Sequence, residues 1–127
     1  MITGVGTDLV SVARIEQALA RHGERFVERL LAPAERVLLP AGGPRRAHWL
    51  AKRWAAKEAV AKAFGTGIGA SIGLRDIEVG RGSAGEPQVT LRGRGAALAQ
   101  ARGVARIHLS LSDEGDLALA FVVLSSV

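Results

Sequence analysis

The clearest pattern of apolar and polar positions lies in the middle of the chain, over residues 45–63. Most residues there are Ala, Leu, Lys, Arg or Glu, with no internal Gly or Pro, and this composition predicts a helix. Gly65 follows as the expected stop. Leu50, Trp54 and Glu58 recur at four-residue steps, so the pattern places a carboxylate in line with apolar side chains.

The position of Glu58 needs an explanation, because a buried carboxylate without a partner is unfavourable. Lys62, one turn further on, is a local partner, and a metal ion is another. The residues alone leave two interpretations open: an internal Glu58–Lys62 pair that supports the helix, or half of a binding site. The segment 65–69, GTGIG, resembles a phosphate loop, but it follows a helix and lacks the P-loop lysine, so by itself it indicates little.

The remaining periodicity predicts short elements on both sides of this helix. Helices are expected from Ser11 onward, over 24–31 and over 95–102, and strands over 2–10, 76–81, 87–91, 106–112 and 117–124. A strand, then helices, then mainly strands predicts one α+β domain over residues 1–127, with an antiparallel-rich sheet packed on the long helix.

The first predicted strand carries two features of interest. Gly4 and Gly6 leave room for another backbone to approach closely. Asp8 lies near the end of the strand, shortly before Ser11, which is a candidate N-cap for the next helix. The local pattern leaves two interpretations of Asp8 open: a turn or capping residue, or part of a site.

Composition and charge narrow the function classes. With 127 residues, 48% of them apolar, the chain can bury the core of one domain. It has no run of about twenty apolar residues and no basic leader followed by an apolar segment, which favours a cytoplasmic protein without a membrane span. The absence of cysteine excludes disulfides and thiolate-ligated metals, so any metal must take oxygen ligands. The net charge of +5 favours acidic partners: a nucleotide, a nucleic acid or an acidic protein.

Arginines line the helices that follow the first strand. Arg14 and Arg21 lie two turns apart on one side, and Arg25 and Arg29 follow at a four-residue step. Such a basic face is either solvated or docks an acidic protein. Structural or solvated roles are expected for the three histidines, His22, His48 and His108.

Five segments, in this order and over essentially the whole chain, resemble the holo-acyl-carrier-protein synthase family of small phosphopantetheinyl transferases. They are GVGTDLV-S-VARIE, FVERLLAPAE, KRWAAKEAVAKAFGTGIG, GEPQV and HLSLSD-ALAFVV. The resemblance implies transfer of the 4′-phosphopantetheine arm of coenzyme A to a serine of an apo acyl carrier protein. The second product is adenosine 3′,5′-bisphosphate.

The resemblance also implies roles for individual residues. Asp8 and Glu58 are expected to ligate a magnesium ion that also holds the coenzyme A pyrophosphate, and Lys62 to contact the phosphates. This agrees with the preference of Mg²⁺ for one or two carboxylates plus substrate phosphates. Glu58 or a magnesium-bound water is expected to take the serine proton. The residues expected to bind the coenzyme are Arg45, Arg53, Lys62, Gly65, Thr66 and Pro87.

The sequence departs from the family pattern at one position. The last motif usually reads Ser-x-Ser-His, and here Asp113 stands in place of the histidine. An aspartate repels phosphate unless it points away, so other cations are expected to carry more of the coenzyme binding: Arg45, Arg46, Arg53 or Lys57. The resemblance further implies that an acidic carrier docks on Arg14, Arg21 and Arg25, and that the chain forms a homotrimer with active sites between subunits.

Two other function classes remain on the residues alone. A different magnesium-dependent phosphotransfer or phosphodiester enzyme would use the same carboxylates. A binding module for acidic proteins or nucleic acid would explain the charge. However, the chain has no recognised nucleic-acid motif and few aromatic side chains for base stacking, so no nucleic-acid partner is expected. Because it has no long apolar run, no membrane partner is expected either.

Overall fold

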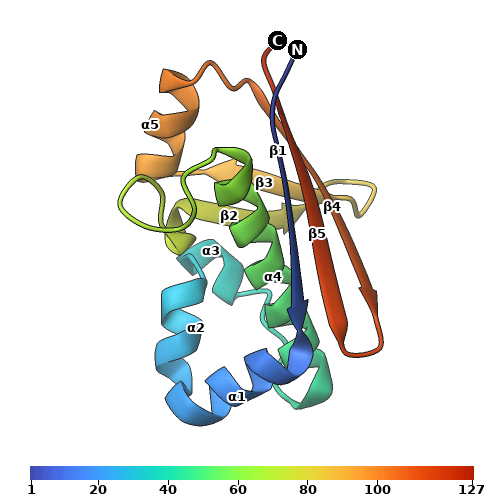
Figure 1. Cartoon of the computed structure of the whole chain (residues 1–127). Coiled ribbons are helices and arrows are strands. Elements are labelled where there is room, and N and C mark those ends of the chain that lie inside the picture. Colours follow the sequence, from blue (N-terminus) through green and yellow to red (C-terminus); the bar gives the residue numbers. More distant parts are fainter.

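The structure is a computed structural model that describes the whole chain, residues 1–127. One strand is followed by a run of helices and then mainly by strands, as expected for the α+β class (Figure 1). In chain order the elements are β1 Ile2–Ser11, α1 Val12–His22, α2 Glu24–Leu30, α3 Pro33–Arg36, α4 Gly43–Ala63, the 3-10 turn η1 Leu74–Asp76, β2 Ile77–Arg81, β3 Pro87–Leu91, α5 Gly93–Ala101, β4 Arg106–Glu114 and β5 Leu117–Ser125.

The strands are divided between two antiparallel sheets, where a single sheet was expected. One sheet has the order β1-β5-β4, and the other is the hairpin β2-β3. Strands β3 and β4 lie side by side, but a groove of about 520 Å³ opens between them, lined by residues 86–89 and 105–109. The polar turn after β4 joins it to β5 as a hairpin, as predicted.

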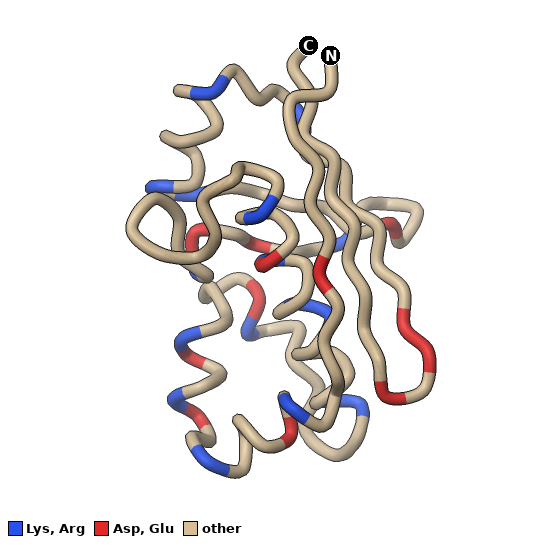
Figure 2. Tube along the Cα trace, in the orientation of Figure 1, with Lys and Arg blue, Asp and Glu red and all other residues tan.

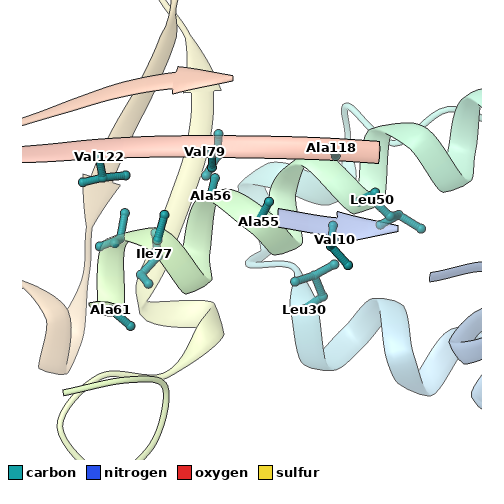
Figure 3. Close-up of a cluster of buried hydrophobic side chains, with 14 of the residues drawn as sticks. Val10, Leu30, Leu50, Ala55, Ala56, Ala61, Ile77, Val79, Ala118 and Val122 are labelled. Atoms are coloured by element: carbon teal, nitrogen blue, oxygen red, sulfur yellow. The ribbon is translucent and has the colours of Figure 1, made fainter. Parts of the chain in front are cut away.

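Helix α4 is the centre of the core, with α1, β1, β2 and β5 packed around it. Figure 3 shows Ala55, Ala56 and Ala61 of α4 among larger apolar residues of the strands and of α2. The buried positions of α4 are mostly alanines: Ala47, Ala51, Ala55, Ala56, Ala59, Ala61 and Ala63. Because these side chains are small, the surrounding elements pack close to the helix axis. None of the helices combines the length and the apolar composition that a membrane span requires.

Strand β1 lies directly against α4 at its two glycines, as the sequence predicted. A Cβ atom added at Gly6 would overlap the carbonyl oxygen of Ala59, and one added at Gly4 would overlap that of Ala63. No other residue type fits at these points without moving the strand or the helix. This contact fixes how β1 and α4 lie against each other next to Asp8.

Candidate metal and phosphate site

Asp8 and Lys62 meet where β1 crosses α4. Asp8 pairs with Ala120 on β5, and its side chain shares the inner face of β1 with the glycines, because successive side chains alternate between the faces of a strand. The Nζ atom of Lys62 donates to Asp8 Oδ1 at 3.0 Å and to the carbonyl oxygen of Thr7 at 3.1 Å. Lys62 therefore pairs with Asp8 and not with Glu58, which rules out the local helix pair as its role.

Glu58 lies on α4 one turn before Lys62 and is half-buried. Burial raises its pKa, and the neighbouring negative charge of Asp8 raises it further, while Lys62 and Arg14 lower it. Asp8 therefore lies close enough to Glu58 to influence its ionisation. Residues 50 positions apart are thus brought together by the β1–α4 contact.

A divalent cation fits this arrangement. Two neighbouring carboxylates repel each other when both are ionised, and a cation between them removes the penalty. Nowhere do three or more His, Asp or Glu side chains gather as a metal cluster. The protein can therefore offer two carboxylate ligands, with the remaining positions left to water and substrate oxygens. This is how Mg²⁺ is usually held at phosphate-binding sites.

The glycine-rich segment after α4 ends the helix beside Lys62. Gly65 and Gly67 have φ angles of 79° and 67°, a backbone conformation that favours glycine. The amide of Gly65 donates to the carbonyl oxygen of Lys62, and the amide of Thr66 donates to that of Ala61. The segment is a helix stop, as predicted.

An arginine that the sequence did not single out holds this segment. Arg94 donates through Nη1 to the carbonyl oxygens of Ala70, at 2.8 Å, and Gly69, and through Nε to Asp76. Asp76 in turn accepts from the amide of Gly73. No local pattern links Arg94 to a loop 25 residues earlier, so these contacts could be found only in the fold.

Three residues expected to bind the coenzyme do not lie with the carboxylates of their own chain. Arg45 is in the first turn of α4, about 25 Å along the helix axis from Lys62. Pro87 begins β3 and lines the groove beside β4. Arg53 lies five residues before Glu58 and therefore projects from another face of the helix. A single chain thus lacks part of the expected coenzyme site.

Arg53 is almost completely buried, with 2% of its surface exposed. Its guanidinium lies 3.8 Å from the centre of the Trp49 ring, and its Nε atom has no hydrogen-bond partner. Burial lowers the pKa of Arg53 to about 10; Glu35 opposes this shift and Arg81 adds to it. The side chain is therefore a cation held inside the protein, with one donor still free.

Two further cations proposed for the coenzyme have other partners. Lys57 is fully buried and pairs with Glu35 at 2.6 Å, so it cannot reach a ligand and that expectation is wrong. Arg46 pairs with Glu24 and donates to the carbonyl oxygens of Pro40 and Ala41. Sequence reasoning missed these partners because the buried pair joins residues 22 positions apart.

The departure at Asp113 has a local counter-charge. Its Oδ2 atom lies 3.8 Å from the Nζ atom of Lys52 on α4. The aspartate therefore points toward a cation of its own chain. His108, also on β4, is exposed and lies 3.1 Å from the hydroxyl of Ser125, which agrees with the structural or solvated role expected for it.

The arginines expected to dock an acidic partner, Arg14, Arg21 and Arg25, are all exposed on α1 and α2. Figure 2 shows acidic positions interspersed with the basic ones along these helices. Arg14 lies close enough to Glu58 to lower its pKa. The basic surface therefore adjoins the two carboxylates.

Comparison with known proteins identifies the family of the chain. The family model described as the 4′-phosphopantetheinyl transferase superfamily matches residues 4–122. The holo-[acyl-carrier-protein] synthase of Halorhodospira halophila is 51% identical over 124 residues, covering 98% of each chain. That of Alkalilimnicola ehrlichii is 52% identical over 126 residues, covering 99% of this chain and 98% of the relative.

Solved structures of the same kind match the whole fold. The synthase of Neisseria meningitidis has a TM-score of 0.92 at 41% identity and covers 99% of this chain and 100% of its own. The Helicobacter pylori synthase in complex with coenzyme A has a TM-score of 0.84 at 32% identity, covering 95% and 99%. As its five motifs predicted, the chain belongs to the holo-acyl-carrier-protein synthases of the 4′-phosphopantetheinyl transferase superfamily.

Proposed function

We propose that this chain transfers 4′-phosphopantetheine from coenzyme A to a serine of an apo acyl carrier protein, releasing adenosine 3′,5′-bisphosphate. The observation that carries the proposal is the meeting of Asp8 and Lys62 beside Glu58, where β1 crosses α4. Related synthases have been solved in complex with coenzyme A, and relatives half identical to this chain are holo-[acyl-carrier-protein] synthases.

Each residue of the site has a proposed role in the reaction. Asp8 and Glu58 would hold a magnesium ion, which when bound neutralises charge on the pyrophosphate and improves the bisphosphate as a leaving group. Lys62 binds the phosphate oxygens and stabilises negative charge that develops as the carrier serine attacks the β-phosphorus. The bond from the serine oxygen to that phosphorus forms as the bond to the bisphosphate breaks, and the serine proton passes to Glu58 or to a water molecule.

Assembly as a homotrimer would complete the coenzyme site. The outer face of the β1-β5 pair exposes a row of large apolar side chains: Val5, Leu9, Leu117, Leu119 and Phe121. Such a patch is unusual on a monomer and is typical of an interface. We propose that this face contacts neighbouring subunits, and that Arg45 and Pro87 contribute to the site of a neighbour. Arg53, with 2% of its surface exposed, offers too little surface to contact a ligand in this structure.

The acidic carrier would dock on α1 and α2 through Arg14, Arg21 and Arg25. Charge complementarity supports this surface, and so does its position next to Glu58. Gly65 and Thr66 would line the coenzyme pocket mainly through their backbone. The cytoplasmic location stays a prediction from the sequence.

The test is a change of mass. Incubated with coenzyme A, Mg²⁺ and an apo carrier protein, the chain should add one phosphopantetheine to the carrier, and chelation of Mg²⁺ should stop the reaction. Free phosphopantetheine without modified carrier would identify a phosphodiester hydrolase instead. If the chain binds several apo carriers but modifies none of them, it is a binding module for acidic proteins and not an enzyme.

A further inference from the structure

A buried ion pair that the proposed reaction does not use joins four parts of the fold. Lys57 on α4 has no exposed surface, and Glu35 on α3 has 2%. Lys57 Nζ donates to Glu35 Oε1 at 2.6 Å and to the carbonyl oxygen of Leu30, the last residue of α2. Glu35 also accepts from the backbone amides of Ala32 and of Val79, the latter on β2.

Such a pair is weak as a source of stability. Removing two charges from water costs several kcal/mol per ion, and the attraction between them often does no more than offset that cost. Burial accordingly lowers the pKa of Lys57, and the charge and hydrogen bond of Glu35 oppose the shift. A pair of apolar side chains could fill the same space, so the ionic pair calls for a role other than stability.

The composition of α4 suggests that role. Most of its buried side chains are alanines, which leave a smooth surface with few interlocking groups to fix the rotation of the helix about its axis. Lys57 is the longest of its fully buried side chains. Its two partners are fixed: a backbone carbonyl at the end of α2, and a carboxylate anchored to two backbone amides.

Rotation of α4 matters for the neighbouring residue, Glu58. At a radius of about 6 Å, a rotation of about 20° would move a side-chain end by about 2 Å. A catalytic constellation tolerates displacements of only about 0.5 Å. The glycine contacts set the spacing of β1 and α4, but they act on one side of the helix, whereas Lys57 acts on another.

We infer that Lys57 and Glu35 are positioning residues, which fix the rotation of α4 so that Glu58 and Lys62 face Asp8. The inference rests on the function proposed above. Lys57 directly precedes Glu58 in the sequence but has a different role. It does not contact substrate and acts only by holding helix α4 in place.

The experiment compares two ways of weakening this part of the core. The double variant Lys57→Met/Glu35→Gln removes both charges, and the glutamine oxygen can still accept from a backbone amide. The control Val60→Ala removes buried volume from the same helix without touching the pair. For each protein one measures the melting temperature, kcat, the KM values for coenzyme A and carrier, and Mg²⁺ affinity by calorimetry.

If the pair positions the helix, the double variant stays folded but loses at least about tenfold in kcat and in Mg²⁺ affinity, while Val60→Ala keeps both within about threefold. The inference is overturned if the double variant loses less than about tenfold in kcat or in Mg²⁺ affinity. It is also overturned if Val60→Ala loses as much as the double variant at the same melting temperature. Should the double variant fail to fold, Lys57→Gln/Glu35→Gln, which keeps polar side chains at both positions and leaves no buried charge, decides by the same criteria.

Measurements on the parent chain distinguish failure of the positioning role from failure of the proposed function. A parent chain that binds Mg²⁺ but does not modify the carrier contradicts the proposed function, and the calorimetric comparison still decides the positioning role. A parent that neither turns over nor binds Mg²⁺ contradicts both.

Discussion

The ionised side chain of Glu58 lowers the stability of the folded protein when no cation is bound. Its pKa is raised by burial and by Asp8, so its ionised form is disfavoured in the folded state. A carboxyl group with a raised pKa stabilises the fold below its unfolded pKa, and that contribution is lost as the pH rises through the folded value. At neutral pH the ionised side chain is therefore unfavourable without a cation.

Glu58→Gln should consequently raise the melting temperature at neutral pH in the absence of metal. The difference from the parent should shrink towards about pH 4, where Glu58 is protonated. Thermal unfolding at both pH values measures this, with Glu114→Gln in the exposed hairpin as control. A variant less stable than the parent at neutral pH would show that Glu58 is held by partners of its own.

The Asp8–Lys62 pair should contribute little to stability, because the lysine is half exposed and such pairs are worth about 0–1 kcal/mol. Lys62→Met should therefore change the melting temperature by no more than about 5 °C, while kcat falls by about 100-fold or more. Lys52→Met, which breaks a partly exposed pair on the same helix, is the control and should retain most of kcat. Loss of folding in Lys62→Met would indicate a structural role instead.

Local sequence patterns could identify unusual residues of the site but not their partners. Periodicity placed Glu58 on an unusual face of its helix but could not choose its partner, and it left open whether Asp8 is a turn residue or part of a site. Only the family resemblance paired the two, because their meeting depends on a contact between distant segments. Lys57 looked like one more cation for the coenzyme, since no local pattern reveals that Glu35 lies beside it.

At the scale of elements, the site depends on the close contact of β1 with α4. Gly6→Ala places a methyl group against the carbonyl oxygen of Ala59, so the strand or the helix must move. We expect a loss of about 1–3 kcal/mol in the free energy of unfolding and a larger proportional loss of kcat, because Asp8 moves with the strand.

The matched control is Gly80→Ala on β2, where an added Cβ meets nothing within 4 Å. Denaturant titration and carrier modification should leave this variant near the parent. If Gly6→Ala keeps full activity, the close contact does not set the geometry of the carboxylates.

Most elements could be predicted because their patterns are local. The sequence placed the long helix and the five strands to within a few residues. It missed the four-residue helix α3, which is too short for a periodic pattern and is capped by the Glu35 carboxylate. It also missed the division into two sheets, since strand pairing across the chain leaves no local signal.

At the scale of the whole molecule, the exposed apolar face predicts assembly. Phe121→Asp places a charge in the middle of this face, on the central strand β5. We expect the trimer to dissociate, with loss of activity, because the coenzyme site of one chain is incomplete. Light scattering after size exclusion measures the mass of the particle.

Val37→Asp changes a more exposed apolar residue on another part of the surface and should leave the trimer intact. A parent chain that is monomeric and fully active would refute the proposed inter-subunit site.

The central claim is that Asp8 and Glu58 act as one metal-binding unit in the transfer, and a double-mutant cycle tests it most directly. The rate of carrier modification is measured by mass spectrometry for the parent, Asp8→Asn, Glu58→Gln and the double variant, at saturating coenzyme A and over a range of Mg²⁺. Each single variant should lose about 100-fold or more, and the double variant should lose hardly more than either, because residues of one unit are not additive. The claim would be contradicted if the rate loss of the double variant equalled the product of the two single losses. It would also be contradicted if the rates of the single variants stayed within about threefold of the parent rate.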